Sequence, residues 1–114
     1  NDRLRAQQEL SQNGRSILEN MAKTVREKSL DTALTDEDTL TFLDGTVFQY
    51  TSPNILKNGS SMNPSSTRVS SVIFSQDATS AQPLILILMR LEKTYRGKTE
   101  SMDFQTTISS RVYE

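Results

Sequence analysis

Leu84-Ile85-Leu86-Ile87-Leu88-Met89-Arg90-Leu91 is the most apolar run of this 114-residue chain, and it decides the reading of the fold. Six apolar residues follow one another without interruption, far fewer than the ~20 that a membrane-spanning helix needs. The run predicts a central β-strand that continues through Tyr95 and is apolar on both faces. The longer apolar face carries the odd positions Ile85, Ile87, Met89 and Leu91. The other face carries Leu84, Leu86 and Leu88.

Strands are also predicted on both sides of this run. Before it, the apolar positions of Val69 to Phe74 break strict alternation, which predicts a β-bulge between Val69 and Val72. After it, the chain turns at residues 96–98 and Met102 to Tyr113 predict the last strand. One side of that strand would carry Phe104, Thr106, Ile108, Ser110 and Val112.

A hairpin is predicted further upstream, where Asp44-Gly45 separates two β-rich runs, residues 39–43 and 46–50. A two-residue turn would pair Phe42 with Val47 and Thr41 with Phe48. That register divides the apolar residues between two faces: Leu40, Phe42 and Val47 on one, and Leu43, Phe48 and Tyr50 on the other. Residues 51–68 predict a long loop, with a short edge strand at Ile55-Leu56.

Residues 2–28 predict one amphipathic helix, because they lack proline and repeat apolar residues at a 3.6-residue spacing. The apolar stripe is Leu10, Gly14, Ile17, Leu18, Met21, Ala22 and Val25. Before Leu10 only Leu4 and Ala6 are apolar, too few to hold the first turns on a core. A helix start of this kind either extends from a longer helix or enters a partner's groove, so Leu4, Ala6 and Leu10 are candidate partner-binding residues.

These elements predict one α+β domain over residues 1–114. A helix at residues 1–28 would pack on an antiparallel sheet of about five strands formed by residues 39–114. The sequence does not alternate strands with helices, so it gives no indication of a parallel sheet.

Composition argues for a binding or structural domain and against an enzyme. The chain has no His and no Cys, which excludes Ser-His-Asp and Cys-His sites, the usual zinc sites and disulfides. Its Ser and Thr residues therefore have no histidine to activate them as nucleophiles. We expect no cofactor, no metal ion and no small-molecule substrate. The net charge of −1 argues against a basic surface for nucleic acid.

Two charged clusters have solvent-exposed interpretations. Asp36-Glu37-Asp38 lacks the ligand spacing of a calcium-binding loop, so we interpret it as a solvated acidic loop. Lys93, Arg96 and Lys98 surround Tyr95, but three cations on a turn could contact few phosphates. We interpret this patch as a solvated hairpin tip rather than a DNA-binding site.

Four segments resemble the soluble domain of type IV pilin-like proteins, specifically the minor pilin or minor pseudopilin group. They are the amphipathic helix Arg5–Glu27, the two-strand unit Leu40–Tyr50 followed by Ile55–Gly59, the strand Arg68–Phe74, and the closing strand Phe104–Tyr113 with its Thr-rich centre and late Arg. The leader, cleavage site and apolar half-helix that begin such precursors have no counterpart here. The resemblance therefore implies that the apolar half of the helix is missing from this sequence.

The resemblance implies a non-enzymatic subunit of a type IV filament machine: a pilus, a type II secretion pseudopilus or a DNA-uptake pseudopilus. Its partners would be other pilin or pseudopilin subunits, and the membrane through the missing N-terminal helix. The full-length protein would be anchored in the bacterial cell envelope, with this domain periplasmic or extracellular.

Two questions stay open on the residues alone. The chain could instead be a stand-alone surface-binding or adhesin domain whose ligand contacts lie in the 51–68 and 75–83 loops. The face formed by Leu84, Leu86 and Leu88 needs a cover, which either the 51–68 loop or a neighbouring subunit could provide.

Overall fold

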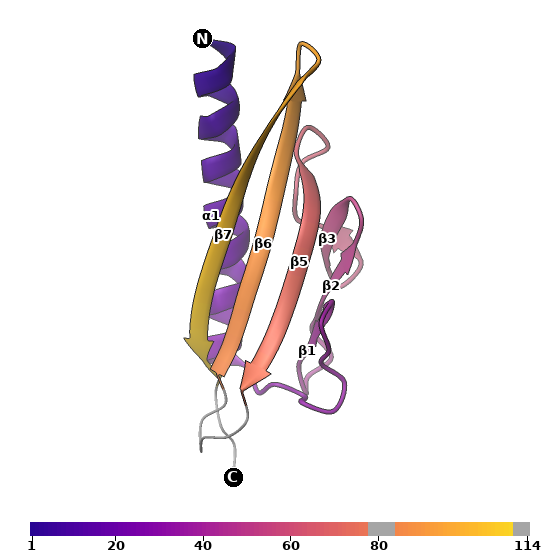
Figure 1. Ribbon diagram of the computed structural model, residues 1–114. Coiled ribbons are helices and arrows are strands. Elements are labelled where there is room, and N and C mark those ends of the chain that lie inside the picture. Colours follow the sequence, from indigo (N-terminus) through magenta and orange to yellow (C-terminus); the bar gives the residue numbers. More distant parts are fainter. Residues whose placement is uncertain (78–83, 111–114) are drawn as a thin grey trace.

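A long helix and two antiparallel sheets make up the part of the chain that the computed structural model describes, residues 1–77 and 84–110 (Figure 1). The helix, α1, spans Asp2–Glu27, as its apolar spacing predicts. Asn1 caps it, since the Asn1 side-chain oxygen accepts a hydrogen bond from the Arg3 N–H at 3.0 Å. The helix ends where Lys28 takes an extended backbone conformation. At 1.5 Å per residue α1 is about 39 Å long.

The larger sheet contains three strands in the order β5-β6-β7. They are β5 (Arg68–Asp77), β6 (Leu84–Tyr95) and β7 (Lys98–Ser109). The central strand β6 has the predicted bounds, and the predicted bulge in β5 lies between Val69 and Ser71. β7 begins four residues earlier than predicted, because Arg96 and Gly97 both take positive φ angles and close a two-residue turn. Val112 and Tyr113 lie outside the described residues.

The smaller sheet contains four short strands in the order β1-β2-β3-β4. They are β1 (Thr39–Thr41), β2 (Val47–Thr51), β3 (Asn54–Lys57) and β4 (Ser60–Ser61). The prediction of one sheet of about five strands is therefore wrong. The short strand predicted at Ile55-Leu56 is confirmed as β3, but it is not an edge strand, because it pairs with both β2 and β4, and these pairings replace most of the predicted long loop at 51–68.

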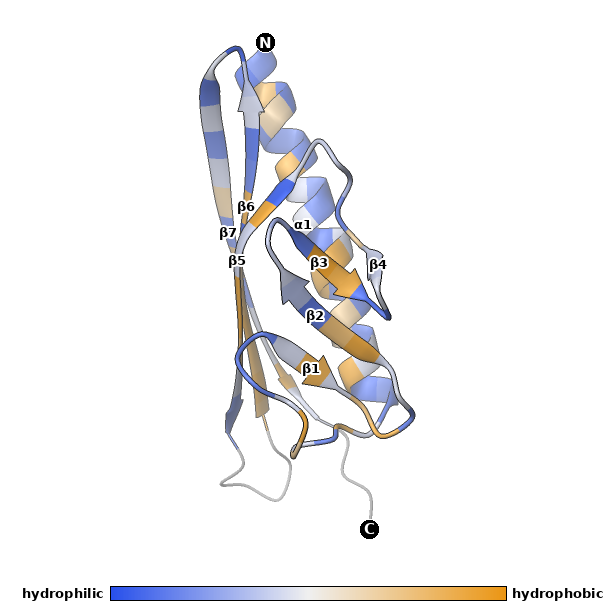
Figure 2. Cartoon of the chain, turned by 90° about the vertical axis from the view of Figure 1, so that its right-hand side faces the viewer, coloured by the Kyte–Doolittle hydropathy of each residue, from blue (hydrophilic) through white to orange (hydrophobic). Residues whose placement is uncertain are grey.

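The edge of β5 explains why the two sheets do not merge. The Val69 N–H donates to the carbonyl of Pro53, and the Phe74 N–H donates to the carbonyl of Glu37, each at 2.8 Å. Both acceptors belong to connecting segments outside the strands. Each accepts one hydrogen bond from β5, and no strand of the smaller sheet forms a continuous series of backbone hydrogen bonds with β5. The smaller sheet consequently meets the larger one at an angle (Figure 2).

The register of the first hairpin differs from the prediction by one residue. Thr41 pairs with Val47 and Leu40 with Phe48, because the connection is a three-residue loop. The Gly45 N–H donates to the carbonyl of Phe42 at 3.0 Å, and Gly45 takes a φ of 95°. A one-residue shift exchanges the faces of a whole strand. The shift brings Leu40, Phe42 and Phe48 onto the buried face and leaves Leu43 65% exposed.

Both sheets share one apolar core with α1. The stripe residues Leu10, Ile17, Met21 and Val25 are at most 2% exposed, and so are the four odd positions of β6. The smaller sheet contributes Leu40, Phe48 and Ile55, all fully buried. Figure 2 shows the larger sheet edge-on, with α1 and the smaller sheet on the same side of it.

α1 and the larger sheet approach each other closely at Gly14. A Cβ atom at this position would lie 2.1 Å from the ring of Phe104 on β7. Glycine therefore lets the ring of Phe104 rest directly on the helix backbone.

Candidate functional site

The start of α1 lies beside the tip of the β6–β7 hairpin at one end of the elongated molecule (Figure 1). Three ion pairs link the two elements. Asp2 Oδ2 lies 2.7 Å from Arg96 Nε, and Glu100 Oε1 lies 3.1 Å from Arg3 Nε. Glu9 of α1 pairs with Lys93 of β6. We call these six residues the end clamp.

Tyr95 adds a hydrogen bond to the end clamp. Its hydroxyl donates to Glu100 Oε1 at 3.3 Å. Partial burial and the neighbouring Glu100 carboxylate raise the pKa of Tyr95 above its usual range. The phenol therefore stays neutral and remains a hydrogen-bond donor at physiological pH.

The expectation that the helix start has nothing to pack on is wrong. Ala6 is 1% exposed and Leu10 is fully buried, because the β6–β7 hairpin reaches as far as the first turn of α1. Leu4 alone among the three predicted partner-binding residues is open to solvent, with 57% of its surface exposed. Ala6 and Leu10 thus belong to the core of the chain itself.

The second predicted surface is the outer face of the larger sheet, on the side opposite α1. Leu84 is 37% exposed, and Leu86 and Leu88 are half-buried. Ile73, which pairs with Leu88, extends this face and is 46% exposed. The 51–68 segment does not cover it, because β3 and β4 lie on the α1 side of the sheet (Figure 2).

The cations near Tyr95 are largely neutralised within the chain. Lys93 and Arg96, two of the three predicted members of the basic patch, pair with carboxylates of α1. Their charges are therefore compensated by neighbours, as in a structural cluster. Phosphate binding would need them unpaired.

The acidic segment at residues 36–38 is a hydrogen-bonded turn. The Asp38 N–H donates to Asp36 Oδ1 at 3.1 Å. Hydrogen bonding with Asp38 lowers the pKa of Asp36, and the same pairing raises the pKa of Asp38. Within residues 1–77 and 84–110, no group of three or more acidic side chains could hold a metal ion.

The loops assigned to an adhesin-type ligand site take a different form. Most of residues 51–68 lie in β3, β4 and a turn organised by Asn63, whose side-chain amide donates to the Thr67 carbonyl at 2.7 Å. Residues 75–77 continue β5, and residues 78–83 lie outside the described part of the chain.

The end clamp was not predicted, although a length comparison could have revealed it. A twelve-residue strand at about 3.3 Å per residue spans about 40 Å, which matches the length of α1. The tip of the β6–β7 hairpin must then lie near Asp2. Opposite charges on the two elements would have suggested their pairing.

The arrangement offers exposed apolar surface at Leu4 and on the outer face of the larger sheet, a means of protein–protein contact. None of the described helices combines the length and the apolar composition needed to cross a membrane. No family profile, no curated protein and no solved structure matches the chain.

Proposed function

We propose that this chain is a non-enzymatic structural subunit of a type IV filament machine, working by assembly with other pilin-like subunits. The placement of α1 is the observation that carries the proposal. The helix runs along the long axis of a molecule measuring 52 × 24 × 19 Å, and its first turn lies at one end (Figure 1). A helix continued before Asn1 would leave the molecule along that axis.

The end clamp supports the same function. By fixing the first turns of α1 on the hairpin tip, it makes the helix a rigid extension of the β domain. A subunit held by an upstream helix needs such rigidity to present its β domain at one defined orientation. The proposal requires an apolar helical segment directly upstream of Asn1, so the upstream coding sequence is its first test. Anchoring by that segment would place the protein in the bacterial cell envelope.

Contacts with neighbouring subunits are assigned to two surfaces. Leu4 is the exposed apolar residue at the helix start. Leu84, Leu86 and Leu88, on the outer face of the larger sheet, form the second surface. Covering an exposed apolar group with a neighbour is favourable, because it removes apolar surface from water. No reaction, cofactor or small-molecule substrate is part of the proposal.

The substitution Leu4→Asp tests the role of the helix start. In the isolated domain it should change the free energy of unfolding by less than about 0.5 kcal/mol, because surface substitutions act weakly. In the full-length protein it should strongly reduce filament assembly, because a carboxylate would enter a packed interface without a partner. Urea denaturation and electron microscopy of filaments measure the two effects.

Leu43→Asp is the matched control, since Leu43 is 65% exposed and lies in the loop of the first hairpin, at the opposite end of α1 from Leu4. It should leave both stability and assembly unchanged. Normal assembly of the Leu4→Asp protein would contradict the proposed contact at Leu4, whereas failure of the unchanged full-length protein to assemble would favour a stand-alone binding domain. Unfolding of the isolated Leu4→Asp domain would show that Leu4 serves the core of the chain.

A further inference from the structure

We propose that the free edge of β7 and the adjoining groove of α1 bind an extended acidic peptide segment as an added strand. This site is separate from the filament contacts at Leu4 and on the outer sheet face. It would serve recognition of another protein's extended segment by backbone pairing.

One edge of β7 has no partner among the described residues. The strand pairs with β6 alone, and no backbone hydrogen bond links it to any other described segment. The two-residue turn makes Tyr95 and Lys98 a hydrogen-bonded pair. Hydrogen-bonded and non-hydrogen-bonded pairs alternate along an antiparallel ladder, so the even-numbered residues of β7 bond to β6. The odd-numbered residues, among them Gln105, Thr107 and Ser109, direct their N–H and C=O groups away from β6.

The opposite edge of the sheet is not available in the same way. Carbonyl groups of Glu37 and Pro53 already accept from N–H groups of β5. A strand approaching β5 would have to displace those segments. Within residues 1–77 and 84–110 the larger sheet therefore has one open edge, and α1 lies beside it (Figure 1).

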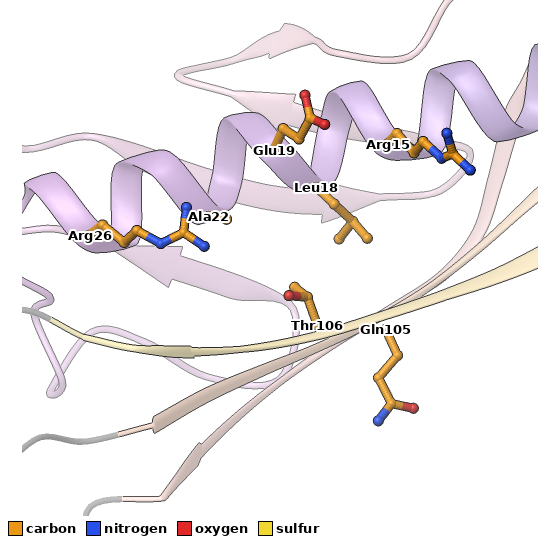
Figure 3. Close-up of a pocket in the computed structure, with 7 residues that line it drawn as sticks. All are labelled: Arg15, Leu18, Glu19, Ala22, Arg26, Gln105 and Thr106. Atoms are coloured by element: carbon orange, nitrogen blue, oxygen red, sulfur yellow. The ribbon is translucent and has the colours of Figure 1, made fainter.

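A groove of about 300 Å³ runs between this edge and α1. Leu18 and Ala22 supply its apolar surface, and Thr106 of β7 faces them (Figure 3). Arg15 and Arg26 stand at its two ends, with Glu19 between them. Both arginines are exposed, and neither makes an ion pair with a described residue.

The spacing of the two arginines defines the segment that would fit. Arg15 and Arg26 are about 16 Å apart along the helix, which corresponds to about five residues of an extended strand. Side chains that face α1 alternate, so their acidic groups must be four or six residues apart. Apolar residues between them would lie over Leu18 and Ala22, and would keep the carboxylates away from Glu19.

A second copy of this chain fits the edge less well. Pairing of β7 with β7 of another copy is a two-fold contact, in which each surface meets itself. The seam would bring the Arg15 and Arg26 side chains of both copies close together, with only one carboxylate per copy, Glu19, to offset two cations. Repulsion of like charges therefore favours an acidic segment from a different protein.

The peptide Asp-Thr-Leu-Thr-Leu-Thr-Asp, with blocked ends, is the probe for this site. Titrated into the isotope-labelled domain, it should shift the amide resonances of Gln105, Thr107 and Ser109. Those amides should also exchange more slowly with solvent when the peptide is bound, because they acquire carbonyl acceptors. The same peptide with Asn in place of both Asp residues should bind at least about tenfold more weakly, since charge-assisted hydrogen bonds to arginine are lost.

Matched variants separate charge from backbone pairing. Arg15→Glu and Arg26→Glu should each weaken binding at least about tenfold, whereas Lys23→Glu, on another side of α1, should not. Thr107→Pro removes one outward N–H and should also abolish binding, and edge strands tolerate proline. Thr99→Pro makes the same change near the hairpin tip, outside the groove, and should leave binding intact.

Four outcomes would overturn the proposal. One is absence of peptide binding at millimolar concentration. Another is equal binding of the Asp and Asn peptides. A third is a set of resonance shifts confined to other strands. The fourth is a dimer in sedimentation experiments that Thr107→Pro dissociates, which would assign the edge to a second copy. These measurements use the isolated domain, so they leave the filament proposal to its own test.

Discussion

At Gly14 the absence of a side chain lets the ring of Phe104 approach α1, so a larger residue there should destabilise the fold. Gly14→Leu should lower the free energy of unfolding by about 1–3 kcal/mol, since overpacking forces the ring out of its site. Urea denaturation measures the change. The expected loss persists although leucine is the better helix former.

The double variant Gly14→Leu, Phe104→Ala supplies the control. With the ring removed, the leucine can fill the vacated space, so the two substitutions should compensate in part. A cost of Gly14→Leu that is the same with and without Phe104 would show that the ring does not limit the site.

Asp44 is a second residue with a specific test, because it links the first hairpin to the end of α1. Its carboxylate lies 2.8 Å from Lys28 Nζ and accepts from the Thr46 N–H at 2.9 Å. The Lys28 hydrogen bond, followed by those of Thr46, lowers the pKa of Asp44 from 3.8 to about 2. A carboxyl whose pKa is depressed by folding stabilises the protein above the unfolded value, and this stabilisation disappears as pH falls.

We therefore expect the contribution of Asp44 to be complete above about pH 4 and to be lost between about pH 4 and pH 2. Over that interval the wild-type domain should lose more stability than Asp44→Asn in urea denaturation. NMR titration should give Asp44 a midpoint near 2, and Lys28→Met should raise it. A wild-type midpoint close to 3.8 would contradict the assigned cause.

Among the elements, the start of α1 depends most on charge. Exposed ion pairs are weak and are screened by salt, whereas buried apolar contacts are not. In 1 M sodium chloride the amides of residues 6–10 should exchange faster than at low salt. The amides of residues 21–25 should be unaffected, because Met21 and Val25 are fully buried and no ion pair of the end clamp reaches this part of the helix. Hydrogen exchange followed by NMR measures both.

Lys93→Gln is the control for that experiment. It removes the charge that pairs with Glu9, so it should speed exchange at low salt and reduce the additional effect of salt. Salt-independent exchange in the wild-type domain would show that Ala6 and Leu10 alone hold the helix start in place.

The strands divide into those that the sequence predicts well and those that it does not. In β6 every second residue from Ile85 to Leu91 is apolar and buried, and the bounds and the buried face of the strand are as predicted. The helix stripe is confirmed for the same reason, a strong period over many residues. β3 and β4 have too few residues to show a period, and β4 consists of two serines. The apolar pair Ile55-Leu56 indicated β3, but only tertiary pairing defines β4.

The hairpin register shows what a turn motif leaves undetermined. Asp-Gly is compatible with both a two-residue and a three-residue loop, and the choice moves Phe48 from one face to the other. Requiring the large apolar side chains to share a face would have selected the observed pairing, with Leu40 opposite Phe48. For the candidate site, the exposure of Leu4 was predicted, but the end clamp depends on contacts between segments distant in sequence.

At the scale of the whole molecule, one core joins two sheets, so both should unfold together. Leu40 and Phe48 of the smaller sheet belong to the same apolar cluster as Ile87 of the larger sheet. The tyrosines allow a direct test, because Tyr50 lies in β2 and Tyr95 in β6. Incorporated fluorotyrosine should report the same urea midpoint at both positions. Separate midpoints would show two units that fold independently.

The packing of α1 against β7 also has a consequence for biosynthesis. Roughly 70 residues separate Glu27 from Lys98, and a ribosome adding about 5–20 residues per second needs roughly 4–14 s to make them. During that time β7, which supplies most of the larger sheet's contact with α1, is not available to cover the apolar stripe of the helix. The nascent chain must therefore expose part of that stripe, open to chaperones or to aggregation, until β7 has been translated.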